Sequence, residues 1–178
     1  MPPDILQAVA LAESGRSVGE RLQPWPWAVS FAGQGRWYDD PTSAELAVTE
    51  RLALGATNVD IGCFQLNYRW HGDAFPTIGA MFDPDRNARY AARFLAEKFA
   101  ETGDWVDAAA AYHSRTPEHA ARYKSRVKTL LSGLPSQFTQ AVVARVNRYP
   151  LLIGGQAGAI GSLVPALEGG NGLFGGAP

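Results

Sequence analysis

The sequence predicts a mainly α-helical domain with a small β-hairpin, and two observations indicate this fold class. Apolar residues recur at helical spacing in several segments, and Asp-Pro pairs or glycines stand where these segments begin or end. Two short extended runs, one ending at Phe31 and one beginning at Arg36, surround a Gly33-Gln34-Gly35 turn and are typical of a hairpin. The 178 residues suit one domain with a sizeable core.

The first predicted helix, from about Ile5 to Ser14, ends in one acidic residue, Glu13. Glu13 shares a helix face with Leu6 and Ala10 at i, i+4 and i+7 spacing, so we expect it to face inward at the last turn before Gly15. A carboxyl group in apolar surroundings resists ionisation, as a proton donor near neutral pH requires. Taken alone, the segment also fits an ordinary solvated acid at a helix end.

Capping patterns predict where the helices start. Asp4 with Gln7 resembles a capping box for the first helix, and Asp40-Pro41 opens a second, with Thr42 and Glu45 as an alternative capping pair. The second helix stops at Gly55, and a turn-rich stretch from Asn58 to Tyr68 follows. Three later helices start at Asp83-Pro84, at Asp104 and at Thr116-Pro117.

Helical periodicity predicts the buried faces of these helices. The second helix carries its periodicity on Leu46, Thr49 (or Glu50) and Leu54. The long helix that runs to about Ala100 has a stripe of Ala88, Ala91, Ala92, Leu95 and Phe99. The last of the three places Ala120, Tyr123, Val127 and Leu130 on one side. The aromatic residues between Arg21 and Asp40 are interpreted mainly as core, with stacking on sugar rings as the alternative.

The composition divides the chain into three parts. Residues 1–133 form the predicted globular domain, and residues 134–150 form a C-terminal amphipathic helix carrying Phe138, Val142, Val146 and Tyr149. Residues 151–178 are rich in glycine and predict a flexible tail. Its apolar segments, such as Leu151-Leu152-Ile153, suit docking on a partner, although an inert or inhibitory tail is an equal alternative.

The charge and residue content exclude several classes of function. The formal net charge is −1, so no overall field draws the protein to nucleic acid or a membrane surface, and no apolar run is long enough to span a bilayer. Cys63 is the single cysteine, which excludes an internal disulfide. His71, His113 and His119 lack the spacing of a helical zinc site, so we expect no metal and no cofactor. Residues 1–4 show no secretory signal, which indicates either that the protein is not exported by the secretory route or that the chain is trimmed.

Three short motifs and a tyrosine stand in a suggestive order. They are Glu13-Ser14, Gly62-Cys63-Phe64-Gln65, Ala111-Tyr112-His113 and Tyr123. This set resembles the SLT-type soluble lytic transglycosylases, which share the goose-type lysozyme fold and have the pattern Glu-Ser, Gly-Leu-Met-Gln, Ala-Tyr-Asn and tyrosine. The resemblance spans about Ile5 to Val127. Pro26 to Val29 and Asn58 to Gly62 look most like the branch attached to flagella and secretion systems.

The chain departs from the family pattern at two places. Cys63-Phe64 replaces the usual Leu-Met, which exchanges one apolar pair for another in the floor of the expected cleft. His113 replaces the usual asparagine. Both side chains form hydrogen bonds, but histidine also titrates near neutral pH, so a changed pH profile is expected at this position.

The resemblance implies cleavage of peptidoglycan in the periplasm. Glu13 would protonate the glycosidic oxygen between MurNAc and GlcNAc and then accept the proton of the MurNAc C6 hydroxyl, which attacks C1 and gives a 1,6-anhydro end. The resemblance also implies that Gln65 and Ser14 hold the glycan and that Tyr112, His113 and Tyr123 line the cleft. A flagellar rod or secretion-apparatus protein is the implied partner of the tail.

Two alternatives remain open from the residues. Asp60 is a rival carboxylate that would make the protein a hydrolysing muramidase, because glycosidases commonly use two carboxyl groups, although an aspartate beside a glycine more often shapes a turn. The second alternative is a catalytically silent adaptor that only binds glycan. Tyr112 and Tyr123 are also interpretable as core residues, Gln65 as a turn residue and Ser14 as a plain helix end.

Overall fold

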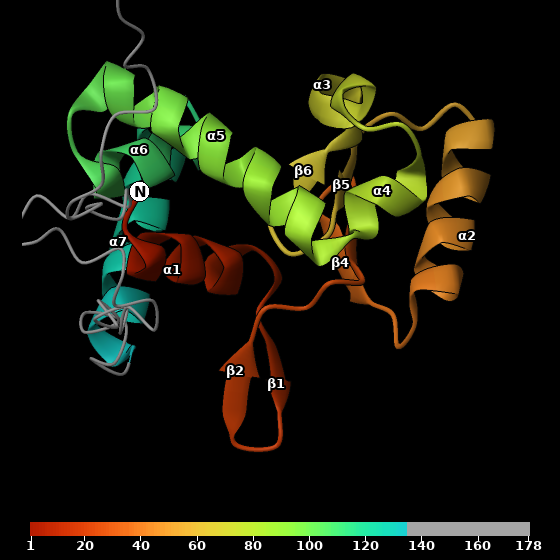
Figure 1. Ribbon diagram of the computed structural model, residues 1–178, viewed down its shortest axis with the longest axis horizontal. Helices are drawn as coiled ribbons and strands as arrows, with labels where there is room; N and C mark the ends of the chain where they lie inside the picture. The colour runs from red at the N-terminus through yellow and green to blue at the C-terminus, as the bar shows by residue number, and fades with distance from the viewer. Residues whose placement is uncertain (135–178) are drawn as a thin grey trace, which may run out of the picture. The chain divides into compact units, whose positions relative to one another are not determined.

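The structure is a computed structural model that describes residues 1–134 (Figure 1). Of these residues, 61% are helical and 14% lie in strands, in seven α-helices, one 3-10 helix and six short strands. The predicted mainly α class with a small β-structure is therefore confirmed. The predicted amphipathic helix and flexible tail lie, beyond Leu134, outside the described residues. Within residues 1–134, no helix has the length and apolar character needed to cross a bilayer.

Four helices form one group in which each packs on the next. They are α5 (Pro84–Thr102), α6 (Trp105–His113), α7 (Pro117–Gly133) and α1 (Pro3–Ser14), in that order of contact. At its other end, α5 packs on α4 (Ile78–Phe82), which also packs on α2 (Pro41–Ala53). Figure 1 shows α5 running from α6 toward α4. Two short elements precede α4: α3 (Tyr68–His71) and the 3-10 helix η1 (Gly72–Ala74).

A four-stranded antiparallel sheet holds the second part of the molecule. Its order is β4 (Gln34–Trp37), β3 (Ala28–Phe31), β5 (Val59–Ile61) and β6 (Leu66–Asn67). The β3–β4 pair is the predicted hairpin, but it turns at Ala32 and Gly33, one step earlier than expected, because these two residues have positive φ angles of 50° and 88°. The stretch predicted as turn-rich supplies β5 and β6, which corrects that prediction.

A second hairpin, β1 (Arg16–Val18) with β2 (Arg21–Gln23), was not predicted. It follows α1 directly and projects away from the sheet (Figure 1). Its strands are three residues long and mostly exposed. They are therefore too short for the sustained alternation of apolar and polar residues by which a strand is predicted from sequence.

Most of the predicted helix starts are confirmed. Asp40, Asp83 and Asp104 each accept hydrogen bonds from backbone N–H groups of the first turn, as N-caps do. The capping box at Asp4 and Gln7 is wrong, because α1 starts at Pro3 and has no side-chain cap. The alternative Thr42–Glu45 pair is not the cap of α2, since Asp40 holds that position.

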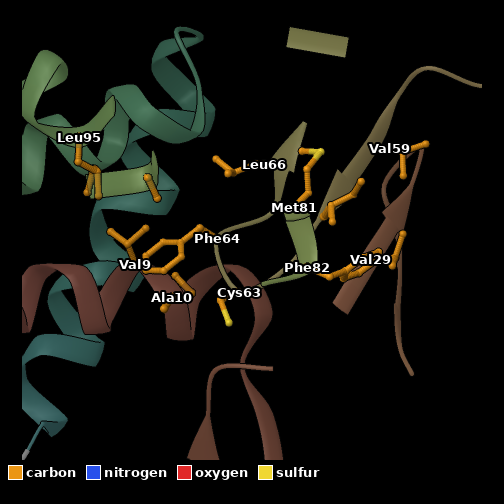
Figure 2. Close-up of a cluster of buried hydrophobic side chains, with 14 of the residues drawn as sticks. Val9, Ala10, Val29, Val59, Cys63, Phe64, Leu66, Met81, Phe82 and Leu95 are labelled. Atoms are coloured by element: carbon orange, nitrogen blue, oxygen red, sulfur yellow. The ribbon is translucent and has the colours of Figure 1, made fainter. Parts of the chain in front are cut away.

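The core lies where α1, α5 and the sheet meet (Figure 2). Val9, Leu66, Met81 and Leu95 are fully buried in it, and Phe64 from the turn after β5 belongs to the same cluster. The stripes on α5 and α7 are confirmed at their centres, by buried Ala91, Leu95, Tyr123 and Val127. The face predicted for α2 is wrong: Leu46 and Leu54 are 58% and 81% exposed, and the helix instead buries Ala44 and Val48.

Candidate active site

Glu13 stands on the last turn of α1, with its side chain only 12% exposed. Its Oε1 atom is buried and accepts no hydrogen bond within residues 1–134. The nearest basic group is His113, whose Nδ1 lies 3.6 Å from that oxygen. A nearly buried carboxyl oxygen without a partner is costly in a folded protein, so such atoms occur mainly where function requires them.

Ser14 fixes the end of α1 and does not line a cleft. Its side chain is 1% exposed, and Oγ donates to the Cys63 carbonyl oxygen at 2.7 Å, with the Ala10 carbonyl oxygen at 3.2 Å as a second acceptor. The same oxygen accepts a hydrogen bond from the Trp25 backbone N–H. Ser14 was predicted to bind substrate, but the structure places it outside the lining of the cleft, where it ties the end of α1 to the neighbouring loops.

The turn Gly62-Cys63-Phe64-Gln65 is held by a residue that sequence reasoning missed, Asn87 of α5. Its side chain is fully buried; Nδ2 donates to the carbonyl oxygens of Ile61 and Met81, and Oδ1 accepts from the Phe64 N–H at 3.0 Å. Gly62 has a φ of +83°, and a Cβ there would lie 2.6 Å from Asn87 Nδ2. The sequence did contain a signal for this role. Asn87 is a polar residue one helical turn before Ala91, so it lies on the predicted buried stripe of the long helix.

Tyr112 also acts on this turn and does not line the cleft. Its hydroxyl donates to the Phe64 carbonyl oxygen at 2.7 Å, and its ring packs against Phe94. Burial raises the pKa of the Tyr112 hydroxyl well above its ordinary value, and the negative charge of Glu13 adds to that rise. The phenol therefore stays protonated and keeps its hydrogen bond, which makes Tyr112 a positioning residue instead of a cleft wall.

Gln65 presents one free atom to the cleft. Its backbone has a φ of 46°, and its Nε2 donates to the carbonyl oxygens of Ala28 and Gly62, both at 3.1 Å. These two acceptors fix the orientation of the amide, because only the nitrogen can donate to them. The side-chain oxygen is then the atom left to accept a hydrogen bond from a ligand.

A cleft of about 660 Å³ brings four of the six predicted site residues together: Glu13, Gln65, His113 and Tyr123. The rings of His113 and Tyr123 stack at 4.2 Å between centroids and 8° between planes. The Tyr123 hydroxyl is buried beside the Glu13 carboxyl group, and within residues 1–134 it meets the full geometry of a hydrogen bond to no group. Burial raises the pKa of this phenol, and the charge of nearby Glu13 raises it further.

Asp60 lines the same cleft from strand β5. Its Oδ1 accepts a hydrogen bond from Asn67 Nδ2 at 2.8 Å. Burial raises the pKa of Asp60, and the negative charge of Glu13 acts in the same direction. Asp60, the rival carboxylate considered from the sequence, therefore belongs to a strand, lines the cleft and interacts electrostatically with Glu13.

Two further parts of the cleft wall were not singled out from the sequence. Trp37 of β4 is 50% exposed, lines the cleft and donates its indole N–H to the Ser14 carbonyl oxygen, so it is not a core residue. His119, Arg122 and Arg126 line the cleft from α7. These three residues have i, i+3 and i+7 spacing, which predicts that they share one face of the helix that carries Tyr123.

No family model, curated protein or solved structure matches this chain. Within residues 1–134, no group of three or more His, Cys, Asp or Glu side chains is arranged to hold a metal ion. The cleft itself offers carboxyl, phenol, amide, imidazole and guanidinium groups for chemistry.

Proposed function

We propose that this cleft is the active site of a lysozyme-like enzyme that cleaves the glycan strands of peptidoglycan as a lytic transglycosylase. The observation that carries the proposal is Glu13, a nearly buried carboxyl group whose side chain lines a cleft of about 660 Å³ and whose Oε1 has no hydrogen-bond partner within residues 1–134. An acid held in this way stands ready to donate a proton to a glycosidic oxygen, because its side chain lines the cleft and no protein group within residues 1–134 occupies its Oε1 atom.

The proposed reaction uses Glu13 twice. As an acid it protonates the oxygen between MurNAc C1 and the next GlcNAc, and the C1–O bond breaks with development of positive charge on the ring. As the resulting carboxylate it accepts the proton of the C6 hydroxyl of the same MurNAc while that oxygen bonds to C1. The product carries a 1,6-anhydro ring, no water is consumed, and the carboxyl group is regenerated.

The other cleft residues support this reaction by position. The free oxygen of Gln65 is suited to accept a hydrogen bond from a sugar hydroxyl or acetamido N–H group. The unpaired Tyr123 hydroxyl is placed to donate one near Glu13. Trp37 offers a half-exposed indole at the rim, a surface on which sugar rings stack.

Asp60 favours a second candidate function, that of a hydrolysing muramidase. A second carboxyl group in the same cleft would orient an attacking water molecule or stabilise the positive sugar ring directly. Burial raises the pKa of Asp60, and the negative charge of Glu13 adds to that rise, so the two carboxyl groups act on each other across one cleft. The two functions share every step up to the choice of nucleophile.

The mass of the products released from murein sacculi tests both candidates. Transglycosylation gives fragments one water lighter than hydrolysis gives, with anhydro ends in place of reducing ends. We expect anhydro products from the wild type and a loss of about 100-fold or more in rate for Glu13→Gln, because the proton donor is removed. The exposed Glu20→Gln variant is the matched control and keeps full activity.

Other outcomes separate the alternatives. Reducing ends that disappear in Asp60→Asn assign hydrolysis. Murein release by Glu13→Gln at the wild-type rate contradicts both catalytic proposals, and glycan binding without turnover by the wild type indicates the silent adaptor. We also propose the periplasm as the place of action, and a flagellar rod or secretion-apparatus protein as a partner of the tail.

A further inference from the structure

Helix α7 lines the cleft with three basic side chains, His119, Arg122 and Arg126, beside Tyr123. Arg122 Nη2 lies 3.1 Å from His119 Nδ1. A guanidinium has only N–H donors, so in this contact the histidine nitrogen accepts. Arg122 and Arg126 bring two guanidinium groups, each with a positive charge, to this wall of the cleft.

No acidic side chain in the described part of the chain neutralises these two charges. Neither Arg122 nor Arg126 forms an ion pair with another residue of the range 1–134, whereas Arg16 and Arg89 each pair with an aspartate. The positive charge also reaches the catalytic end of the cleft. Burial raises the pKa of Tyr123, and the charge of Arg126 opposes that rise, which places Arg126 near the phenol that faces Glu13.

The proposed substrate carries a matching anion, so this inference rests on the proposed function. MurNAc differs from GlcNAc by a lactyl ether at O3, whose carboxyl group is either free or linked to a peptide with carboxylates of its own. Guanidinium groups bind carboxylates with two parallel hydrogen bonds, a geometry that a lysine does not reproduce. Uncharged GlcNAc offers no such group.

We propose that Arg122 and Arg126 form a carboxylate-binding subsite that makes the cleft select glycan with an acidic substituent next to the cleaved bond. The subsite lies on the same helix as Tyr123, so a carboxylate bound there fixes the acidic ring beside Glu13. Both arginines are exposed, so their replacement removes ligand contacts without removing core packing.

Three glycan preparations test the subsite: strands with their peptides, peptide-free strands with free lactyl carboxylates, and peptide-free strands whose carboxyl groups are converted to methyl amides. The proteins are the wild type, Arg122→Gln/Arg126→Gln, Arg126→Lys and the control Lys128→Gln, an exposed cation of α7 outside the cleft. Affinity is measured by calorimetry in the Glu13→Gln background, and KM and kcat are measured with active enzyme.

We expect the double glutamine variant to bind the free-carboxylate strands at least about tenfold more weakly, as the loss of charge-assisted hydrogen bonds implies. Arg126→Lys should lie between it and the wild type, and Lys128→Gln should match the wild type. The methyl-amide strands should bind the wild type and the double variant equally. A loss seen only with peptide-bearing strands assigns the carboxylate to the peptide instead of the lactyl group.

The proposal is overturned if the double variant keeps wild-type affinity for both charged preparations, if Lys128→Gln loses as much, or if the wild type binds neither preparation. These outcomes differ from failure of the proposed function. Carboxylate-dependent binding without turnover would reject catalysis but keep the subsite, and turnover independent of the carboxylate would reject the subsite but keep catalysis.

Discussion

Asp60 shows how a single residue of the cleft is held in a state that costs stability. Its carboxyl group is partly buried on β5, and both this burial and the charge of Glu13 raise its pKa above 3.8. A carboxyl group whose pKa is higher in the folded protein loses its proton more readily on unfolding. Its contribution to stability is therefore full below pH 3.8 and is lost as the pH rises through the raised value.

We expect Asp60→Asn to raise the midpoint of thermal unfolding at pH 7, because the substitution removes a carboxylate that the fold disfavours while an amide oxygen still accepts from Asn67. The gain should vanish in melts recorded below pH 3.8, where the carboxyl group is protonated in both states. The exposed Asp73→Asn variant serves as the control and should show no gain. An equal or lower midpoint for Asp60→Asn at pH 7 would contradict this account.

At the scale of elements, the turn between β5 and β6 depends on helix α5. Asn87 uses its entire amide group on the carbonyl oxygens of Ile61 and Met81 and the N–H of Phe64. The turn contributes Phe64 to the core and Gln65 to the cleft. One buried side chain thus connects the packing of the domain to the geometry of the site.

We expect Asn87→Ala to lower the free energy of unfolding by about 2–4 kcal/mol, because three buried backbone groups lose their partners. The loss is measured by urea unfolding, with Arg86→Ala on the exposed side of the same helix as the control. Glycan cleavage should also fall at temperatures where the variant is folded, since Gln65 is no longer held. Full stability and full activity in Asn87→Ala would show that the turn holds itself.

At the scale of the whole molecule, the cleft joins segments that are far apart in the sequence. Within residues 1–134 its lining runs from Ala12 to Arg126 and draws on α1, α6, α7 and the four-stranded sheet. The position of Glu13 therefore depends on the packing of all these elements.

We expect a chain that ends at Pro150 to release murein fragments at the wild-type rate, because it keeps every lining residue found within residues 1–134. Under the proposed role of the tail, the same truncation abolishes capture of purified flagellar rod or secretion-apparatus proteins. Unchanged capture of every such protein by the truncated chain would reject the tail as a docking segment. A large loss of cleavage would show that the cleft needs residues beyond those that line it.

Local signals in the sequence determined the helical framework of this protein. The Asp caps of α2, α5 and α6, and the stripes around Leu95 and Val127, act between residues close in the chain, so their effect can be read directly. The order of the motifs likewise predicted that Glu13, Gln65, His113 and Tyr123 belong to one site, and the structure places them around one cleft.

Tertiary structure alone decided what each side chain does there. Ser14 and Tyr112 were correctly placed near the site, but their hydroxyls bond to backbone carbonyls, and only the three-dimensional packing fixes such directions. Asp60 reaches the cleft because β5 pairs with β3, a long-range contact that no local pattern encodes. Sequence spacing acts over one or two helical turns, whereas burial and electrostatic coupling depend on neighbours that are distant in the chain.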